Sequence, residues 1–396
     1  MSNIKGEKTM LEMETSFLKD LVTRASKGAG KDKLLAKSEL VFIKVANGEI
    51  RLFTTDGSTD LEIVKPFSYD GELSVVTDIT PFQKLIEKTT TKTIKLSVDV
   101  DKQVLSFEGN GEYEFPIYLE GGRPIGYPTL TVPDVTPKTM NIETLRTILK
   151  LNGGSVSKDL SIGIQYSGYY FYSRGVDTSD RQSGCRTLTD FLLEFNEDGK
   201  EVECAFMLPS RTMNLLDGVV APTTEWYVDE SGVVIKADDM IIYSQKLEHA
   251  VMDRFPHKTL DGLLESEFSN TIAVNRNELV QAVDRLIVFR KVEFGVPAVT
   301  LHFDKDFLSV MSTKGTGIEV IYCENDPNRV VGEIMVNAEL LKSLLQTCQK
   351  EMIEISYNAQ IMENGNSEVT SSVIVLKEEN TRKFMAKMIQ TQVQQG

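Results

Sequence analysis

The chain shows a recurring order of apolar and polar residues. In residues 74–86, 205–216 and 334–345, a short apolar strand leads into a helix-starting residue and then into paired apolar residues at helical spacing. The Leu-Leu or Leu-Ile pairs of these segments fall about 130 residues apart both times. This spacing predicts an internal repeat.

Each of these helices is preceded, within its repeat, by another amphipathic segment, over residues 16–26, 142–151 and 275–289. Stretches of alternating or wholly apolar residues predict β-strands, and Asn-Gly and Asp-Gly pairs at 47–48 and 56–57 predict tight turns. The expected strands include residues 40–45, 94–98, 232–236, 299–303 and 373–376. Each repeat is therefore predicted to be an α+β module of two helices plus antiparallel sheets.

The domain boundaries follow from the repeat and from a Pro-rich connection at residues 127–133. We expect three domains, at residues 1–131, 132–267 and 268–396. The alternative is that three similar segments occur by chance in an α+β protein whose helices are irregularly spaced.

Composition limits the class of protein. An apolar fraction of 41% over 396 residues can form several cores. Neither a basic stretch followed by an apolar N-terminal segment nor an apolar run of 18 residues occurs, so we expect no signal peptide, no membrane span and a cytoplasmic location. The four cysteines show no C-x-x-C pairing and are expected to be buried free thiols, namely Cys185, Cys204, Cys323 and Cys348.

Enzyme signatures are missing from the sequence. Residues 28–31 lack the spacing of a phosphate-binding loop, residues 109–111 lack the third glycine of a dinucleotide fingerprint, and residues 99–102 make a poor calcium loop. The three histidines have no catalytic context; they are His249, His257 and His302. We therefore expect no catalytic residues, no metal and no cofactor.

Short motifs in all three repeats resemble the bacterial DNA polymerase III β sliding clamp family, in the family's order and spacing over residues 10–389. They are Thr59–Ile63, Phe115–Ile117 followed by Tyr127-Pro128, Phe255-Pro256, residues 275–287 and Phe384–Met388. Two regions depart from the family: residues 177–181 keep only the arginine of its pocket sequence, and a Gln-rich tail follows residue 389. A divergent viral or plasmid copy is one hypothesis that fits these departures.

The resemblance implies a closed six-domain ring of two chains, with the helices facing a central hole. Over the six expected helices we count a charge of about +5, against −15 for the whole chain, so the rest of the chain is acidic. Basic helices and an acidic exterior suit a ring threaded by duplex DNA without sequence preference. The candidate phosphate contacts are Lys19, Arg24, Lys27, Lys84, Lys88, Arg146, Lys150, Arg211, Arg285, Arg290, Lys342 and Lys350. The alternative is that these are ordinary solvated helix faces.

Ring closure in this family joins the first domain of one chain to the third domain of the next. By position, the resemblance places Phe115 and Ile117 on one side of that interface and Ile287 and Val288 on the other. The alternative is that all four are buried within their own domains.

The family also has a partner-peptide pocket between its second and third domains. Carried over by position, this pocket would use Leu160, Arg181, Pro256, Leu260, Met385 and Met388. Methionines at apolar positions can equally be core residues.

These features predict a sliding clamp, a non-enzymatic processivity factor that tethers a replicative DNA polymerase to duplex DNA. Its partners would be the polymerase and a clamp loader, which bind through short peptide motifs. Two other classes stay open: a clamp-like structural or decoy ring without polymerase binding, and an unrelated α+β enzyme.

Overall fold

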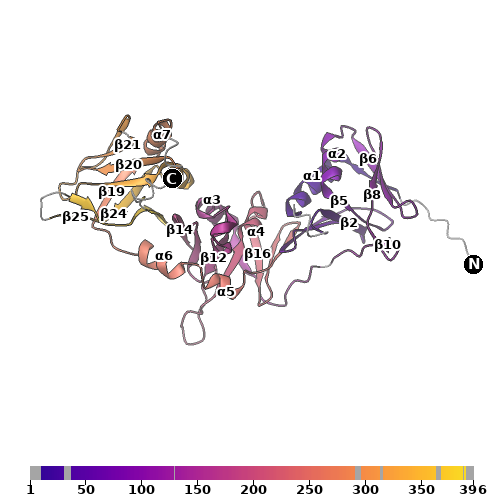
Figure 1. Ribbon diagram of the computed structural model, residues 1–396. Helices are drawn as coiled ribbons and strands as arrows, with labels where there is room; N and C mark the ends of the chain where they lie inside the picture. The colour runs from indigo at the N-terminus through magenta and orange to yellow at the C-terminus, as the bar shows by residue number, and fades with distance from the viewer. Residues whose placement is uncertain are drawn as a thin grey trace, which may run out of the picture. The chain divides into compact units, whose positions relative to one another are not determined.

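The computed structural model describes residues 10–30, 37–128, 130–289, 296–312, 315–362, 367–386 and 388. The chain divides into two compact units. Figure 1 labels helices and strands of both units. The first comprises Met1–Ile142 and Arg211–Lys246, and the second comprises Glu143–Ser210 and Leu247–Gly396. Residues 132–267, the expected middle domain, contribute to both units.

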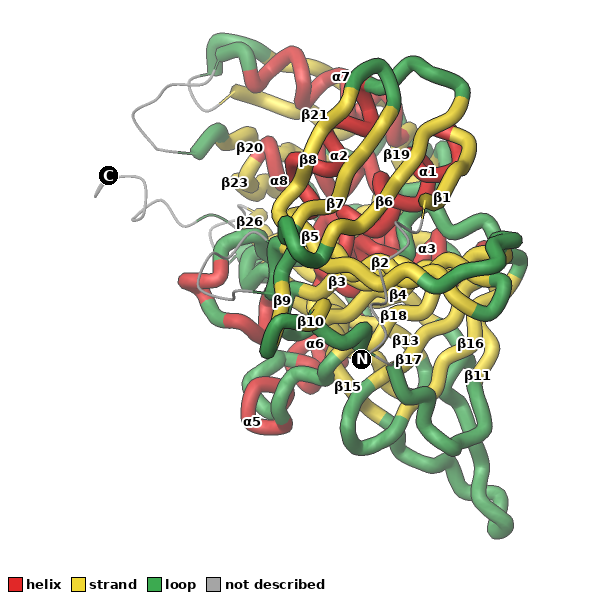
Figure 2. Tube along the Cα trace, turned by 90° about the vertical axis from the view of Figure 1, so that its right-hand side faces the viewer, coloured by secondary structure: helices red, strands yellow, loops and turns green. Residues whose placement is uncertain are grey.

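The first unit is built on antiparallel sheets. Among its described residues, the largest sheet has the order β11 (Lys138–Asn141), β16 (Thr223–Val228), β17 (Val233–Ala237), β18 (Met240–Ser244), β4 (Thr59–Pro66), β3 (Glu49–Thr55), β2 (Leu40–Ala46), β5 (Leu73–Asp78). A second sheet has the order β1 (Met10–Glu14), β6 (Thr93–Asp99), β7 (Val104–Glu108), β8 (Glu112–Pro116), and its last three strands lie side by side in Figure 2. A short pair joins β9 (Leu119–Glu120) and β10 (Arg123–Pro124).

Helices α1 (Thr15–Ala25) and α2 (Ile79–Lys88) pack against each other in this unit, with a 3-10 turn η1 (Ser26–Gly28) after α1 and a short helix α4 (Ser210–Leu215). Helix α1 buries Leu18, Leu21 and Val22 on one face, as its periodic sequence predicts. The β2–β3 hairpin turns at Asn47 and Gly48, which have φ of 55° and 78°. These left-handed values favour Asn and Gly in a tight hairpin turn.

The second unit has the same kinds of layers. In its described part, the largest sheet has the order β15 (Ala205–Pro209), β12 (Gly168–Tyr172), β13 (Gly175–Ser179), β14 (Ser183–Leu188), β28 (Thr381–Ala386), β27 (Val373–Glu378), β24 (Met352–Tyr357), β19 (Asn270–Asn275). A smaller sheet has the order β22 (Ile318–Tyr322), β21 (Phe307–Ser312), β20 (Ala298–Phe303), β23 (Gly332–Asn337), and β25 (Ala359–Ile361) pairs with β26 (Ser367–Val369). The helices are α3 (Ile142–Asn152), α5 (His249–Met252), α6 (His257–Leu264), α7 (Arg276–Ile287) and α8 (Ala338–Thr347), with 3-10 turns η2 (Gly153–Ser155), η3 (Leu160–Ile162) and η4 (Ile164–Tyr166).

One local unit recurs along the chain: a strand that runs directly into a helix. The junctions are β1–α1, β5–α2, β11–α3, β15–α4, β19–α7 and β23–α8. Equivalent helices start about 130 residues apart, which matches the spacing in the sequence. In the last repeat the side chains of Asn275 and Asn337 cap α7 and α8 by accepting hydrogen bonds from backbone amides. The α+β prediction is confirmed, and the division into three domains stays a prediction.

Candidate nucleic-acid interface and partner surface

The predicted phosphate contacts differ in how their charge is used. Four lysines are exposed and make no ion pair within the described part of the chain: Lys27, Lys84, Lys88 and Lys150. Because each lysine projects a charge on a flexible stem, each could reach a phosphate oxygen. These four are therefore the best candidates for contacts with DNA.

The other described candidates are engaged with neighbouring groups. Arg24 pairs with Asp239, Arg146 with Glu143, Arg211 with Asp56, Arg285 with Glu319, Lys342 with Asp284 and Lys350 with Glu379, and Lys19 donates a hydrogen bond to the carbonyl of Glu87. A carboxylate within a few ångströms cancels most of the field that a distant phosphate would feel. Arg290 lies outside the described residues.

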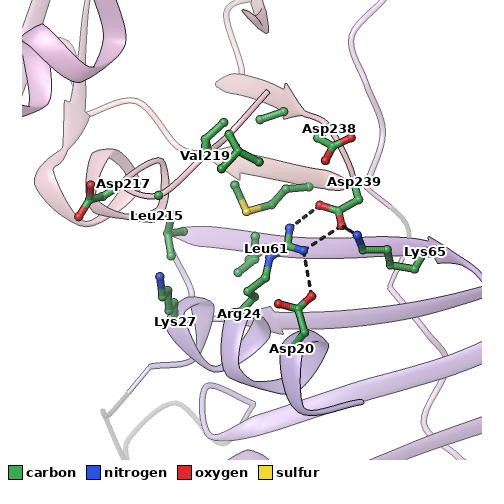
Figure 3. Close-up of a pocket in the computed structure, with 14 residues that line it drawn as sticks. Asp20, Arg24, Lys27, Leu61, Lys65, Leu215, Asp217, Val219, Asp238 and Asp239 are labelled. Carbon is green, nitrogen blue, oxygen red and sulfur yellow. Dashed lines mark hydrogen bonds and ion pairs between the residues drawn. The ribbon is translucent and has the colours of Figure 1, made fainter. Parts of the chain in front are cut away.

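Arg24 lines a cavity of about 360 Å³ in the first unit (Figure 3). Its Nη1 donates to Oδ2 of Asp239 at 2.8 Å, and Nζ of Lys65 lies 2.6 Å from the same oxygen. Burial would raise the pKa of Asp239, but hydrogen bonds and charges from Arg24 and Lys65 outweigh it and hold the pKa below its usual value. Arg24 and Lys65 thus share the partly buried carboxylate of Asp239. The charge of Arg24 is therefore used within the protein.

The cysteines are all free, as the sequence predicts, but only two are buried. Cys185 and Cys348 are enclosed, whereas Cys204 and Cys323 are partly exposed. Burial raises the pKa of Cys185 to about 12 and also raises the pKa of Cys348. The described residues contain no group of three or more His, Cys, Asp or Glu side chains that could hold a metal ion.

The predicted partner residues lie in the second unit, in contrasting environments. Leu160 is 65% exposed on η3, whereas Leu260 and Met385 are buried. Leu260 packs in an apolar cluster with Phe255 and Phe384. Met385 follows Phe384 on β28 and belongs to a different cluster, because successive side chains of a strand point to opposite faces. The structure therefore separates Leu260 from Met385 by the thickness of a sheet.

The remaining partner candidates are closer to the surface. Arg181 is exposed in the β13–β14 turn with φ of 74°, and Pro256 and Met388 are half-buried. The side chain of Asp180 holds this turn by accepting hydrogen bonds from the amides of Gln182 and Ser183 at 3.0 and 2.6 Å. Side-chain hydrogen bonds thus fix the form of the turn, and Arg181 is exposed on it.

Helix α6 was not predicted, and it brings a polar network to this region. His257, Asp261 and Glu265 recur every four residues, and this polar stripe is the signal that could have revealed a helix. The stripe meets a buried pair on the sheet, Asp177 and Arg186, which have 0% and 3% of their side chains exposed. A cavity of about 860 Å³ lies beside the network, lined among others by Tyr172, Asp261 and Glu265.

The predicted interface residues also differ in burial. Phe115 and Ile117 are buried, and Phe115 makes an edge-to-face contact with Phe82 at 5.4 Å between ring centroids. Ile287 is half-buried against its own core, whereas Val288 is 79% exposed. Phe115 and Ile117 are thus buried within this chain, whereas Val288 is accessible to a partner.

Strand β22 was missed as a candidate interface. It is an edge strand of its sheet, and its exposed side chains include Ile318, Val320 and Tyr322, with Tyr322 79% exposed. Exposed Phe289 follows α7, which contacts β22. An apolar edge strand with unpaired backbone groups is a surface for strand addition. The apolar and aromatic residues of the Ile-Glu-Val-Ile-Tyr sequence at 318–322 were the signal for this strand.

Comparisons with known proteins define the class of the fold. No family model and no curated protein sequence matches the chain. Solved structures do: the DNA polymerase III β subunit of Thermotoga maritima (TM-score 0.75, 17% identity, covering 96% of this chain and 99% of that one) and the DNA polymerase sliding clamp of Bacillus subtilis (0.78, 14%, 97% and 100%). The DNA polymerase III β subunit of Pseudomonas aeruginosa superposes with a TM-score of 0.79 at 11% identity, covering 96% and 100%.

The chain therefore has the sliding-clamp fold along nearly its whole length. More particularly, the structures it resembles are bacterial DNA polymerase III β subunits, as the short motifs in the sequence indicated. The low identity accords with a divergent sequence. No helix in the described ranges is long and apolar enough to cross a membrane.

Proposed function

We propose that this protein is a DNA sliding clamp, in which two copies form a ring around duplex DNA and tether a replicative polymerase. The observation that carries the proposal is the full-length match to the clamp fold, with 96–97% of this chain aligned to nearly entire clamp chains. A closed ring retains DNA by topology, so its contacts need only be weak. A cytoplasmic location is part of the proposal.

Ring closure would use the exposed edges of the two small sheets. Strand β8 ends one sheet and β22 ends the other, so β8 of one copy could pair with β22 of the next. Val320 and Tyr322 on β22, together with Val288, would then become buried by the partner copy. Such an interface is head-to-tail, and it closes only if the rotation per copy completes a circle.

DNA contact would rest on the lysines that have no ion pair among the described residues, rather than on the paired arginines. Lys84 and Lys88 lie on α2, Lys150 lies on α3 and Lys27 lies on η1, just after α1. A few such contacts attract the duplex without fixing it at one sequence. This is the binding mode that a sliding protein needs.

The decisive experiment combines mass and topology. Light scattering should give twice the chain mass of 44.3 kDa. Rings reassembled from dilute protomers in the presence of nicked circular plasmid should co-elute with that plasmid and dissociate when a restriction enzyme linearises it. Retention that survives linearisation would show ordinary adhesion, and a monomer indifferent to DNA topology would refute the clamp.

Polymerase tethering needs its own test because the predicted partner residues lie in contrasting environments. Leu160 and Arg181 are exposed, but Met385 is enclosed in the core. Fluorescent peptides from the C-termini of bacterial replicative polymerases should bind the ring and be competed by unlabelled peptide. A ring that encircles DNA yet binds none of them would instead be a structural or decoy clamp.

A further inference from the structure

The second unit contains a charge pair whose burial requires a reason. Asp177 on β13 and Arg186 on β14 face each other in strand register, and Nε and Nη2 of Arg186 donate to the two carboxylate oxygens at 2.9 and 2.7 Å. The guanidinium also lies 5.2 Å from the centre of the Tyr172 ring. Desolvating two charges costs as much as their attraction returns, so such a pair is weak evidence of added stability. Its other partners indicate what it does.

The remaining hydrogen-bonding capacity of the pair is directed at one helix. Nη1 of Arg186 pairs with Asp261 and lies 3.5 Å from Glu265, and Nδ1 of His257 lies 2.8 Å from Oδ2 of Asp177. His257, Asp261 and Glu265 are spaced by four, so they share one face of α6 and its C-terminus. Two side chains of the sheet therefore hold α6 along its length.

Helix α6 needs this support because its own sequence is a poor helix. It has only eight residues, and its N-cap residue Pro256 makes no side-chain capping bond. Asp261 and Glu265 place negative charge toward the C-terminal end, where the helix dipole is already negative. Arg186 supplies the compensating positive charge at that end.

The face of α6 next to this polar stripe is apolar, and Leu260 and Leu264 on it are buried. Leu260 and Leu264 enter the cluster that contains Phe255 and Phe384, while Leu263 is only partly buried against it. Met252 and Tyr170 are also partly buried at the rim of this cluster. A small tilt of α6 would move this rim, which is the part of the cluster that a peptide could touch.

We propose that Arg186 is a positioning residue: it holds α6 through Asp261 and Glu265. It thereby keeps the partner surface, the apolar rim formed by Tyr170, Met252 and Leu263, preformed for a short apolar peptide. The peptide in this proposal rests on the function proposed above. The hold of Arg186 on α6 rests only on the ion pairs described here. Preformation matters because the apparent affinity falls in proportion to the fraction of molecules that are competent to bind.

The test removes the ion pairs between Arg186 and α6 and leaves both the buried pair and the His257–Asp177 contact intact. The double substitution Asp261→Asn with Glu265→Gln changes two half-exposed or exposed side chains and preserves the Asp177–Arg186 pair. Arg186→Met is the harsher variant, which leaves Asp177 buried without its main partner. Arg174→Gln is the matched control, because Arg174 lines the same cavity but pairs with Glu201 and not with α6.

Hydrogen exchange of the α6 amides is the first readout. We expect residues 257–264 to exchange about tenfold faster in the double variant, with β12, β13 and β14 unchanged and Arg174→Gln like the wild type. Stopped-flow binding of the fluorescent polymerase C-terminal peptides is the second. Association should slow by at most the factor by which exchange accelerates, with little change in dissociation, because fewer molecules are competent, whereas a lost contact would speed dissociation.

The outcomes separate the two proposals. Unchanged exchange in α6 would overturn the positioning role, and so would faster exchange combined with unaltered peptide association. If the wild type binds no such peptide, the tethering proposal fails, while the exchange result still decides whether Arg186 holds α6. The ring mass from light scattering should be the same for the double variant and Arg174→Gln, which excludes general unfolding as the cause.

Discussion

Arg24 and Asp239 are separated by 215 residues in the sequence but are joined by two hydrogen bonds in the first unit. The carboxylate also receives Lys65, so it neutralises part of the charge of two cations at one wall of a cavity. The pKa of Arg24 is raised, first because of its hydrogen bond to Asp239. Arg24, which the sequence suggested as a DNA contact, thus also links α1 to the β17–β18 turn.

Replacing Asp239 with Asn should lower the free energy of unfolding by about 1–3 kcal/mol at neutral pH, because two partly buried cations lose their counter-ion. The folded pKa of Asp239 lies below its unfolded value, so its contribution is complete above about pH 3.9 and is lost as the pH falls through the folded pKa. Urea unfolding from pH 7 to pH 3 measures this. The gap between wild type and variant should narrow toward the acid end. Asp217→Asn, at an exposed carboxylate of the same cavity, should show no such gap.

Salt dependence distinguishes free from paired cations. The measurement is retention on circular plasmid at several salt concentrations, plotted as log retention against log salt. If each lysine contacts one phosphate, Lys84→Gln and Lys88→Gln should each reduce the magnitude of this slope by about one. Arg285→Gln should change the slope less, because Arg285 already donates to both carboxylate oxygens of Glu319 at 2.6 and 2.8 Å. A larger effect from Arg285 than from the lysines would show that the ion pair opens on DNA.

The β22 edge provides a test of ring closure. Val320→Lys should convert the dimer to a monomer, because a charged side chain on an edge strand opposes strand addition. Light scattering reports the mass, and Met352→Lys is the matched control, since Met352 is also exposed but lies on β24, which has strand neighbours on both sides. A Val320→Lys protein that keeps the mass of two chains would place the interface elsewhere.

The sequence predicts α1, α3 and α7 to within a few residues because each buries a periodic stripe, and the five expected strands coincide with β2, β6, β17, β20 and β27. Helix α6 escapes prediction because eight residues give barely two turns of periodicity. The strand order also escapes it. β4 pairs with β18, and β14 pairs with β28, each across more than one repeat, and such registers depend on tertiary packing rather than on local pattern.

The candidate site shows the same limit. Sequence reasoning identifies the basic residues of the helices but cannot tell Lys84, which is free of ion pairs in the described chain, from Arg24, whose carboxylate comes from a distant turn. It also cannot tell which face of β28 a methionine occupies, so Met385 was expected at a partner surface and lies in a core. In each case the deciding neighbour is remote in sequence.

Thiol chemistry offers a test of the core of the second unit. Burial raises the pKa of Cys185 to about 12, so at pH 8 only about one molecule in ten thousand would carry the reactive thiolate even if reagent could enter. Iodoacetamide on the native protein should therefore label partly exposed Cys204 first and leave Cys185 unlabelled, as peptide mass spectrometry would show. All four cysteines should react in urea. Because Cys185 lies on β14 beside Arg186, native-state labelling of Cys185 would mean that the strand carrying the α6 anchor opens readily, and the anchor would then be too loose to keep the partner surface preformed.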